Sequence, residues 1–422
     1  MPLSGPAARL INPLRQNEVL LVVSISTMLV MLGQGITGPI LPLFAKSLGV
    51  STAAVGLTLS AFAIARMFLN IPSGLVADRW GRRVLLIGGP VITGLGSVLS
   101  GTATTLEWLL VWRFVAGVGS AMYMTGAIIV VTDIATDQNR GRMLAVNQGA
   151  LLAGITLGPA VGGITAEVFG LRAPFYVVGV AALAAGVWNL LRVPETRPVS
   201  PPASSAGATA AAPARASAWT STLTLLLSLN FMVVALVNFA VFFARAGRQT
   251  VIPLYADQEI GLSAGPIGLV FALMAFINLL FIIPAGWAID RFGVKVTIVP
   301  SALVSLLAFA MIAASHSAMT FVFATVILGV GSGMLGPAPA AYAAEIAPVD
   351  RRGAAMGLFR SLGDAGFVIS PPLVGYLADE SGFGSAILIN GIVLAGSALV
   401  FAVLAGRRRT LAGRAPSPSP AP

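Results

Sequence analysis

Long apolar segments separated by short polar connections make up most of this 422-residue chain. A run of about 20 predominantly apolar residues is long enough to cross the hydrocarbon core of a bilayer as a helix. The pattern predicts twelve such helices, near residues 18–45, 52–77, 83–103, 106–132, 141–168, 172–193, 220–256, 263–288, 294–315, 318–344, 353–378 and 383–406. Because the segment 220–256 is too long for one straight crossing, we expect it to break near Gly247 or Pro253.

The polar positions between these segments repeat along the chain. A shift of 212 positions places one motif on another: Gly74, Asp78, Arg79 and Gly81 in "GLVADRWGRR" fall on Gly286, Asp290, Arg291 and Gly293 in "GWAIDRFGVK". One offset held over nearly the whole chain indicates two equivalent halves in parallel order, with six predicted helices in each. In so apolar a chain, this organisation is typical of a secondary transporter whose substrate path lies between the halves.

Composition and charge agree with a membrane protein. Hydrophobic residues make up 57% of the chain and charged residues 9%, against about 25% charged residues in a typical soluble domain. The net charge of +10 would suit a nucleic-acid partner, but the basic residues gather at the termini and in alternate loops. By the positive-inside rule, this distribution predicts a multi-pass plasma-membrane protein with both termini in the cytoplasm and no nucleic-acid partner.

The chain divides into two bundles and three polar segments. We expect a cytoplasmic N-terminus at 1–17, an N-terminal six-helix bundle at 18–193, a cytoplasmic linker at 194–219, a C-terminal six-helix bundle at 220–406 and a cytoplasmic tail at 407–422. The linker is rich in Pro, Ala and Ser, which predicts a flexible tether. The tail has a similar composition, which predicts disorder.

The loop after the second predicted helix combines a turn with a set of charges. Gly81 permits a tight reversal, and Asp78 stands where it can cap the next helix or pair with an arginine. Arg82 and Arg83 are placed to anchor the loop to anionic headgroups. The loop motif occurs a second time at 286–295. A simple turn would not require this repetition, so the repeat indicates a further role for the loop.

This loop resembles the hallmark motif of the major facilitator superfamily, G-x-x-x-D-R-x-G-R-[RK], and the resemblance covers all twelve predicted helices. It implies an all-α membrane fold of two pseudo-symmetric six-helix bundles. It also implies a cytoplasmic latch built from Gly74, Asp78, Arg79, Gly81, Arg82 and Arg83.

Within the latch, the resemblance implies a charge relay of Asp78, Arg82 and Asp133 that holds the outward-facing state. The second copy of the loop keeps Asp290 and Arg291, but valine replaces the relay arginine at position 294. We therefore expect the latch to work mainly through the N-terminal half.

The fifth predicted helix carries a row of small residues. Gly154, Gly158 and Gly162 are four residues apart and share one face, so another helix backbone can approach closely. Pro159 removes a helical hydrogen bond and is expected to kink the helix. Together with Gly163, the segment resembles the G-x-x-x-G-P-x-x-G-G motif of proton antiporters in the superfamily. The resemblance favours export by antiport over simple small-residue packing.

Away from the helix ends, six charged residues fall inside the predicted helices: Arg66, Arg113, Arg245, Arg248, Arg360 and Asp364. Charged side chains are costly in a membrane, so they face the bundle interior and mark function by default. Arg113 resembles the arginine of the family's R-x-x-x-G segment, which is associated with proton transfer. Burial and a nearby arginine act on the ionisation of Asp364 in opposite directions, which suits a proton carrier. A static pair of Asp364 with Arg360 is the alternative.

The first helix departs from many drug antiporters of the family, which carry a membrane-embedded acid there. This chain has Gln34 instead, which leaves Asp364 and Arg113 as the candidates for proton coupling. Arg245 and Arg248 share a helix face and correspond through the repeat, with one residue of slip, to Gln34 and Thr37. We therefore expect Gln34 and Arg245 to face each other across a central cavity.

The other residues expected to line this cavity are Arg66, Gln148, Asn278 and Arg360. Such a basic cavity suits anionic or carboxylate-bearing substrates better than lipophilic cations. The alternative places Arg245 and Arg248 near the outer surface, with their charged heads in water.

The leading hypothesis is proton-coupled efflux of drugs or small organic metabolites by alternating access. Proton- or ion-coupled uptake of an organic anion is the first alternative, and a non-transporting receptor-like protein is the second. One histidine, no cysteine and no Walker A motif predict neither an enzyme nor a bound metal or cofactor. We expect a monomer whose partners are a small-molecule substrate, protons and membrane lipids.

Overall fold

The computed structural model describes residues 6–136, 138–196, 228–347 and 352–405. Within these ranges the chain forms helices and turns and no strand, which confirms the all-α prediction. The N-terminal half contains α1 (Pro6–Ser47), α2 (Thr52–Trp80), α3 (Arg82–Thr102), α4 (Leu106–Ile134), α5 (Arg140–Phe169) and α6 (Ala173–Arg192). The C-terminal half contains α8 (Leu229–Gln258), α9 (Ala264–Phe292), α10 (Val294–Ala313), α11 (Ala318–Leu335), α12 (Ala338–Ile346) and α13 (Arg352–Leu404).

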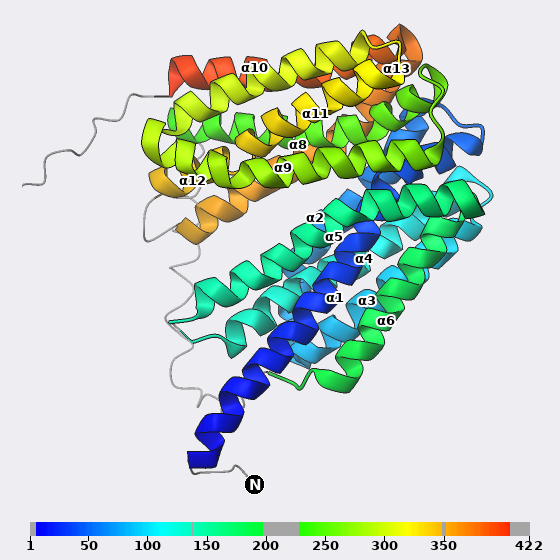
Figure 1. The fold of residues 1–422 in the computed structure, drawn as a ribbon. Helices are drawn as coiled ribbons and strands as arrows, with labels where there is room; N and C mark the ends of the chain where they lie inside the picture. Colours follow the sequence, from blue (N-terminus) through cyan, green and yellow to red (C-terminus); the bar gives the residue numbers. More distant parts are fainter. Residues whose placement is uncertain (1–5, 137, 197–227, 348–351, 406–422) are drawn as a thin grey trace, which may run out of the picture.

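These helices form two bundles that are arranged as a V (Figure 1). In the N-terminal bundle, α1 packs against α5 and α6, and α3 packs against α4 and α6. In the C-terminal bundle, α13 runs along α8 and α10, and α11 packs against α9 and α10. Large apolar side chains such as Phe68, Phe169, Ile283 and Met319 are exposed on the outside, as expected of helices that face lipid. Most of the predicted linker, residues 197–219, and the tail lie outside the described residues.

Eleven described helical segments are long and apolar enough to cross a membrane, from Asn17–Ser47 to Ala355–Leu404. The last of them has 50 residues and contains Gly382, whose φ of 81° and ψ of 164° are not helical. A left-handed φ of this kind is readily adopted only by glycine. The long segment therefore consists of two helices that meet at Gly382.

Two breaks in the helices differ from the prediction. The expected break near Gly247 or Pro253 is wrong, because α8 is continuous through both residues. A Cβ atom on Gly247 would lie 2.0 Å from the side-chain oxygen of Asn390 in α13, so α8 is held closely by its neighbour, and such packing supports helices that contain proline or glycine. Conversely, the predicted helix 318–344 is interrupted between α11 and α12 at Pro337, which has no backbone N–H to continue the ladder.

The buried core joins the two bundles at one end of the V only. There, Ile40 and Phe44 of α1 and Val55 of α2 share an apolar core with α8 and α13. A separate core, which includes Val23 and Val130, belongs to the N-terminal bundle alone. We call the joined end the closed end; its connections are residues 48–51, 103–105, 170–172, 259–263 and 314–317.

The opposite end, which we call the open end, carries Gly81, residues 135, 136, 138 and 139, and Gly293 between its helices. The two bundles draw apart toward this end, on the left in Figure 1. The fold therefore places one interface between the bundles at the closed end and leaves their open ends separate.

Candidate gates and charged site

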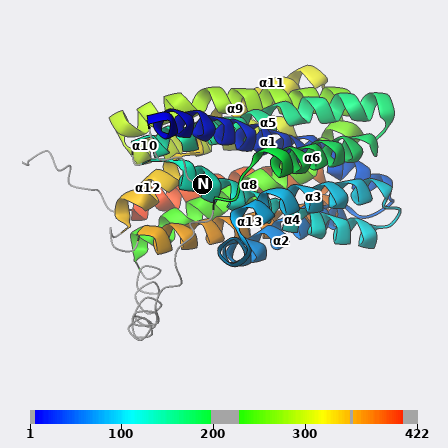
Figure 2. The same cartoon turned by 90° about the horizontal axis from the view of Figure 1, so that it is seen from below.

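The closed end is sealed along two seams, α2 against α13 and α5 against α9 (Figure 2). In the first seam, a Cβ atom on Gly56 would lie 2.2 Å from the carbonyl oxygen of Pro371. A Cβ atom on Gly375 would lie 2.3 Å from the carbonyl oxygen of Thr52. Because real side-chain atoms do not approach this closely, only glycine allows the two backbones to meet.

The second seam is built in the same way. A Cβ atom on Gly268 of α9 would lie 2.4 Å from the carbonyl oxygen of Pro159, and one on Gly163 of α5 would lie 2.7 Å from the carbonyl oxygen of Ala264. The shift of 212 positions that relates the two halves also relates the glycines of the two seams. The closed end is therefore pseudo-symmetric at the level of single residues.

Each seam is also fastened by a carboxylate that caps a helix of the other bundle. Asp379 accepts hydrogen bonds of 2.9 Å from the backbone N–H groups of Thr52 and Ala53, which begin α2. Glu167 accepts one of 2.9 Å from the backbone N–H of Gly265, which begins α9. Hydrogen bonds to ionised groups are stronger than neutral ones, and negative charge is favourable at a helix N-terminus. Glu167 and Asp379 are also 212 positions apart.

The expected charge relay is assembled at the open end. The Arg82 guanidinium lies 3.2 Å from the carboxylate of Asp133 and 3.4 Å from that of Asp78. Gly81 has a φ of 98°, which supports the tight turn between α2 and α3. All three charged residues belong to the N-terminal bundle, so the relay is complete there without the other bundle.

A further carboxylate completes this corner. Glu195, which follows α6, accepts hydrogen bonds of 2.9 and 3.1 Å from the backbone N–H groups of Arg82 and Arg83 at the start of α3. A Cβ atom on Gly81 would lie 2.3 Å from the Glu195 carboxylate, so this glycine is needed for the contact as well as for the turn. The side chain of Arg83 donates to the carbonyl oxygen of Leu190 in α6 at 2.6 Å.

The other latch residues lie outside this set of contacts. Arg79 is exposed at the end of α2, and a Cβ atom on Gly74 would meet nothing within 4 Å. In the second copy of the loop, Asp290 is exposed and forms no ion pair within the described part of the chain. Arg291 instead lies over the rings of Trp287 and Phe292, at 5.6 and 5.8 Å.

The glycine motif of α5 contacts two different helices. Cβ atoms on Gly154, Gly158 and Gly162 would lie 2.4–2.6 Å from backbone atoms of α1. Gly163 and the carbonyl group of Pro159 face α9 across the second seam, as described above. The motif therefore packs α5 against α1 of its own bundle and against α9 of the C-terminal bundle.

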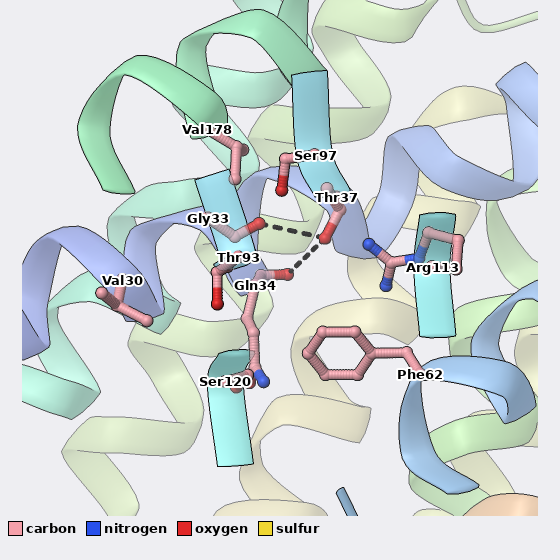
Figure 3. A pocket seen from close by; sticks show the side chains of 10 residues that line it. All are labelled: Val30, Gly33, Gln34, Thr37, Phe62, Thr93, Ser97, Arg113, Ser120 and Val178. Atoms are coloured by element: carbon pink, nitrogen blue, oxygen red, sulfur yellow. Dashed lines mark hydrogen bonds between the residues drawn. The ribbon is translucent and has the colours of Figure 1, made fainter. Parts of the chain in front are cut away.

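Arg113 of α4 points into a small polar cavity inside the N-terminal bundle (Figure 3). The cavity has a volume of about 10 Å³, room for about one water molecule. Arg113 is 6% exposed, and its guanidinium carbon lies 4.7 Å from the centre of the Phe62 ring. Its Nε has no hydrogen-bond partner among the described residues. The polar side chains that line this cavity with it are Gln34, Thr37, Thr93, Ser97 and Ser120.

Four of the predicted arginines form a charge cluster with Asp364. Arg66 of α2 interacts electrostatically with Asp364 and Arg360 of α13 and with Arg245 of α8. Arg248 interacts with Arg245 on the same face of α8. Asp364 forms no close ion pair with any described residue, so the static pair with Arg360 is not found. The charge cluster (Arg66, Arg245, Arg248, Arg360 and Asp364) draws on both bundles.

Three other residues expected to line the cavity have surroundings that the structure describes. Gln34, expected opposite Arg245, lines the cavity around Arg113. Asn278 donates a hydrogen bond of 2.9 Å to the hydroxyl of Ser332, which joins α9 to α11.

Gln148 is exposed, while the preceding residue, Asn147, is buried and accepts a hydrogen bond of 2.9 Å from Thr27. The hydroxyl groups of Thr27 and Tyr123 are 3.0 Å apart, so α1, α4 and α5 are joined by a buried polar network. Of the neighbouring residues Asn147 and Gln148, Asn147 is therefore the one that joins the helices.

Sequence reasoning missed Glu167, Asp379 and Glu195. The first two could have been found from the repeat. The 212-residue shift places Glu167 on Asp379, and it places Ala53, which Asp379 caps, on Gly265, which Glu167 caps. Glu195 had no such signal, because its partners are backbone N–H groups at positions 82 and 83.

The family model of the Major Facilitator Superfamily matches residues 23–247 and 234–421 of this chain. The chain therefore belongs to this superfamily, and it is a transporter rather than an enzyme. It is 25% identical over 368 residues to multidrug resistance protein 1 of Bacillus subtilis, covering 86% of this chain and 91% of that protein. It is 23% identical over 388 residues to the quinolone resistance protein NorA of Staphylococcus aureus, covering 91% and 96%.

Solved structures show the same fold. A bacterial homologue of the human lysosomal transporter Spinster, in an inward-facing and unoccupied conformation, has a TM-score of 0.77 at 16% identity, covering 93% of this chain and 97% of that one. The nucleoside transporter NupG has a TM-score of 0.69 at 16% identity, covering 91% and 98%.

Removing the negative charge of both caps, with Glu167→Gln and Asp379→Asn, should favour opening of the closed end. Each amide keeps one acceptor oxygen but loses the charge that favours a helix N-terminus. A loss of about 1–2 kcal/mol corresponds to a shift of roughly 5–30-fold in the conformational equilibrium. Spin labels at Thr104→Cys and His316→Cys, both exposed at the closed end, should report longer distances by double electron–electron resonance.

The chain has no native cysteine, so these labels are free of background. Glu380→Gln is the matched control, because this exposed acid neighbours Asp379 without capping α2. An unchanged distance distribution in the double variant would show that the caps do not hold the closed end.

Proposed function

We propose that this protein is a proton-coupled exporter of drugs or small organic metabolites that works by alternating access. We propose further that it is a plasma-membrane monomer with twelve crossings and both termini in the cytoplasm. The observation that carries the proposal is the difference between the two ends. The closed end is sealed by repeat-related contacts, while the open end presents corresponding glycines without contacts.

The uncontacted glycines lie on all four helices that form the seams. Cβ atoms on Gly74 of α2, Gly149 of α5, Gly286 of α9 and Gly357 of α13 would meet nothing within 4 Å. Gly74 and Gly286 are 212 positions apart, as are the glycines of the closed end. In the other conformation, these residues would allow the open ends of the same four helices to meet. Rocking of one bundle against the other about a central site is the general mechanism of such carriers.

Charge supports the proposed orientation. The open end carries Arg82, Arg83, Arg140 and Lys295, while acids such as Asp379 lie at the closed end. The positive-inside rule then places the open end in the cytoplasm. In this orientation the structure is inward-facing. The two helices that meet at Gly382 would supply the eleventh and twelfth crossings.

Proton coupling is assigned to Asp364 and Arg113. Asp364 is the one acid of the charge cluster, and its charge interacts with those of Arg66 and Arg360. A change in its protonation would alter the balance of charge between the bundles. Arg113 has a buried Nε with no hydrogen-bond partner among the described residues, in a polar cavity with room for about one water, which suits a group that orients a water on the path of the proton while staying charged itself.

Export is favoured by the α5 glycine motif and by the relatives, whose names report multidrug and quinolone resistance. Uptake of an organic anion is the second candidate, favoured by the excess of arginine in the charge cluster. The direction of net movement against a substrate gradient separates the two.

Gly74→Leu should leave the present conformation intact and stop transport. The new side chain meets open space here, but it would fill the seam in the outward-facing state. Gly396→Leu is the matched control, because Gly396 also has no atom near its Cβ position and is exposed near the end of α13. Both variants should reach the membrane at wild-type levels. Transport by Gly74→Leu at the wild-type rate would contradict alternating access through this seam.

Asp364→Asn should abolish active transport, because an amide at this position cannot carry a proton. Accumulation of a panel of lipophilic cations and organic anions is measured in cells that express the wild type or the variant, with and without a protonophore. The wild type should lower accumulation of at least one compound, and the protonophore should remove the difference. Asp257→Asn, at an exposed acid near the end of α8, is the control.

Raised accumulation of an anion by the wild type would replace the exporter with the uptake carrier. Active export by Asp364→Asn at the wild-type level would show that the proton travels elsewhere.

A further inference from the structure

The charge cluster contains more positive charge than the chain itself neutralises. Among the described residues, Asp364 is the one acid that opposes the charges of Arg66, Arg245, Arg248 and Arg360. Arginine stays protonated under all ordinary conditions, so the cluster keeps an excess of three positive charges when Asp364 is ionised. Charged side chains at this depth in a membrane are retained where they serve a function.

These charges lie at comparable depths on helices of opposite bundles. Arg66 is about 21 Å along α2 from its start at the closed end, and Arg245 is about 20 Å along α8 from its closed end, at ~1.5 Å per residue. Arg248 is one turn closer to the closed end on the same face of α8 as Arg245. An anion held by these residues would therefore touch both bundles.

Two of these arginines have hydrogen-bond donors without a partner among the described residues. The Nε atoms of Arg66 and Arg248 are buried and have no hydrogen-bond partner among the described residues. None of the four arginines forms an ion pair with an acid in the described part of the chain. A planar guanidinium with free donors matches the geometry of a carboxylate or phosphate, which it binds through two parallel hydrogen bonds.

We propose that the charge cluster is the binding site for a small organic anion, whose carboxylate or related oxyanion is held between Arg66 of one bundle and Arg245 and Arg248 of the other. The inference rests on the proposed transport function and specifies its substrate class. The same set of charges repels lipophilic cations.

The site also links binding to movement of the bundles. While the open end admits water, solvent screens the excess positive charge. Closing that end would take the charges out of water, which is costly unless an opposite charge lies between them. A bound anion supplies this charge, and its contacts with both bundles favour their approach. An empty carrier would close less readily than a loaded one.

The proposal is tested by equilibrium binding to the purified full-length protein in phosphatidylcholine nanodiscs. Fluorescein is the anionic probe, followed by fluorescence anisotropy, with citrate as the competitor, and ethidium is the cationic probe. The variants are Arg66→Gln, Arg245→Gln, Arg248→Gln and Arg245→Lys. Arg142→Gln, at an exposed arginine in the first turn of α5, is the matched control.

Each glutamine variant should weaken fluorescein binding by about 10–100-fold, the effect expected from losing a charge-assisted hydrogen bond. Arg245→Lys should lose less, because it keeps the charge but not the planar fork. Arg142→Gln should bind as the wild type does. Thermal unfolding of each variant shows whether it is folded, and a variant that fails is replaced by its lysine counterpart.

Fluorescein binding that is absent, or unchanged in all three glutamine variants, would overturn the proposal. Tighter binding of ethidium than of fluorescein by the wild type would do the same. Loss of fluorescein binding in discs that contain phosphatidylglycerol would assign the site to a lipid headgroup instead of a soluble anion.

Proteoliposomes with an imposed proton gradient separate this inference from the proposed function. If fluorescein binds through the arginines but is not moved by the gradient, the anion site stands and proton-coupled export fails. If ethidium is moved and fluorescein is neither bound nor moved, export stands and the anion site fails.

Discussion

The contact between the two bundles at the closed end determines the shape of this molecule. Four glycines bring α2 against α13 and α5 against α9 at backbone distance, and Glu167 and Asp379 fasten the same seams from opposite sides. The two carboxylate caps are local and reversible contacts, and they lie beside the apolar core that the bundles share at this end. The seal is therefore strong enough to join the bundles and is still made of contacts that can be released together.

The interior charges are tolerated because the bundles are apart at the other end. Five charges with a positive excess lie on the helices that flank the space between them, and the described residues hold no close ion pair for any of the five. Water reaches such groups in an open carrier, whereas a closed one needs a counter-charge. The relay of Asp78, Arg82 and Asp133, by contrast, is complete within one bundle. The relay and Glu195 thus stabilise a corner of the N-terminal bundle while the bundles are separated.

Much of this architecture could be predicted from the sequence, because apolar runs and a repeated motif report lipid contact and duplication directly. The latch charges also came together as expected, since they lie near a loop and at a helix end. The continuity of α8 at Gly247 was not predictable, because it depends on Asn390 of a distant helix. The place of Gln34 beside Arg113 was not predictable for a similar reason: the repeat identifies its helix but not the neighbours of its side chain. Glu167 and Asp379 become meaningful only when the pairing of helices across the bundles is known.

The most direct test of this account is a measurement of both ends in one experiment. One pair of spin labels, Thr104→Cys with His316→Cys, reports on the closed end, and a second, Gln138→Cys with Val296→Cys, reports on exposed positions of the open end. Distances for each pair are recorded in nanodiscs at neutral and acidic pH, with and without citrate. The account predicts opposite changes, in which the open-end distance shortens as the closed-end distance lengthens. Changes in the same direction, or a change at one end alone, would contradict it.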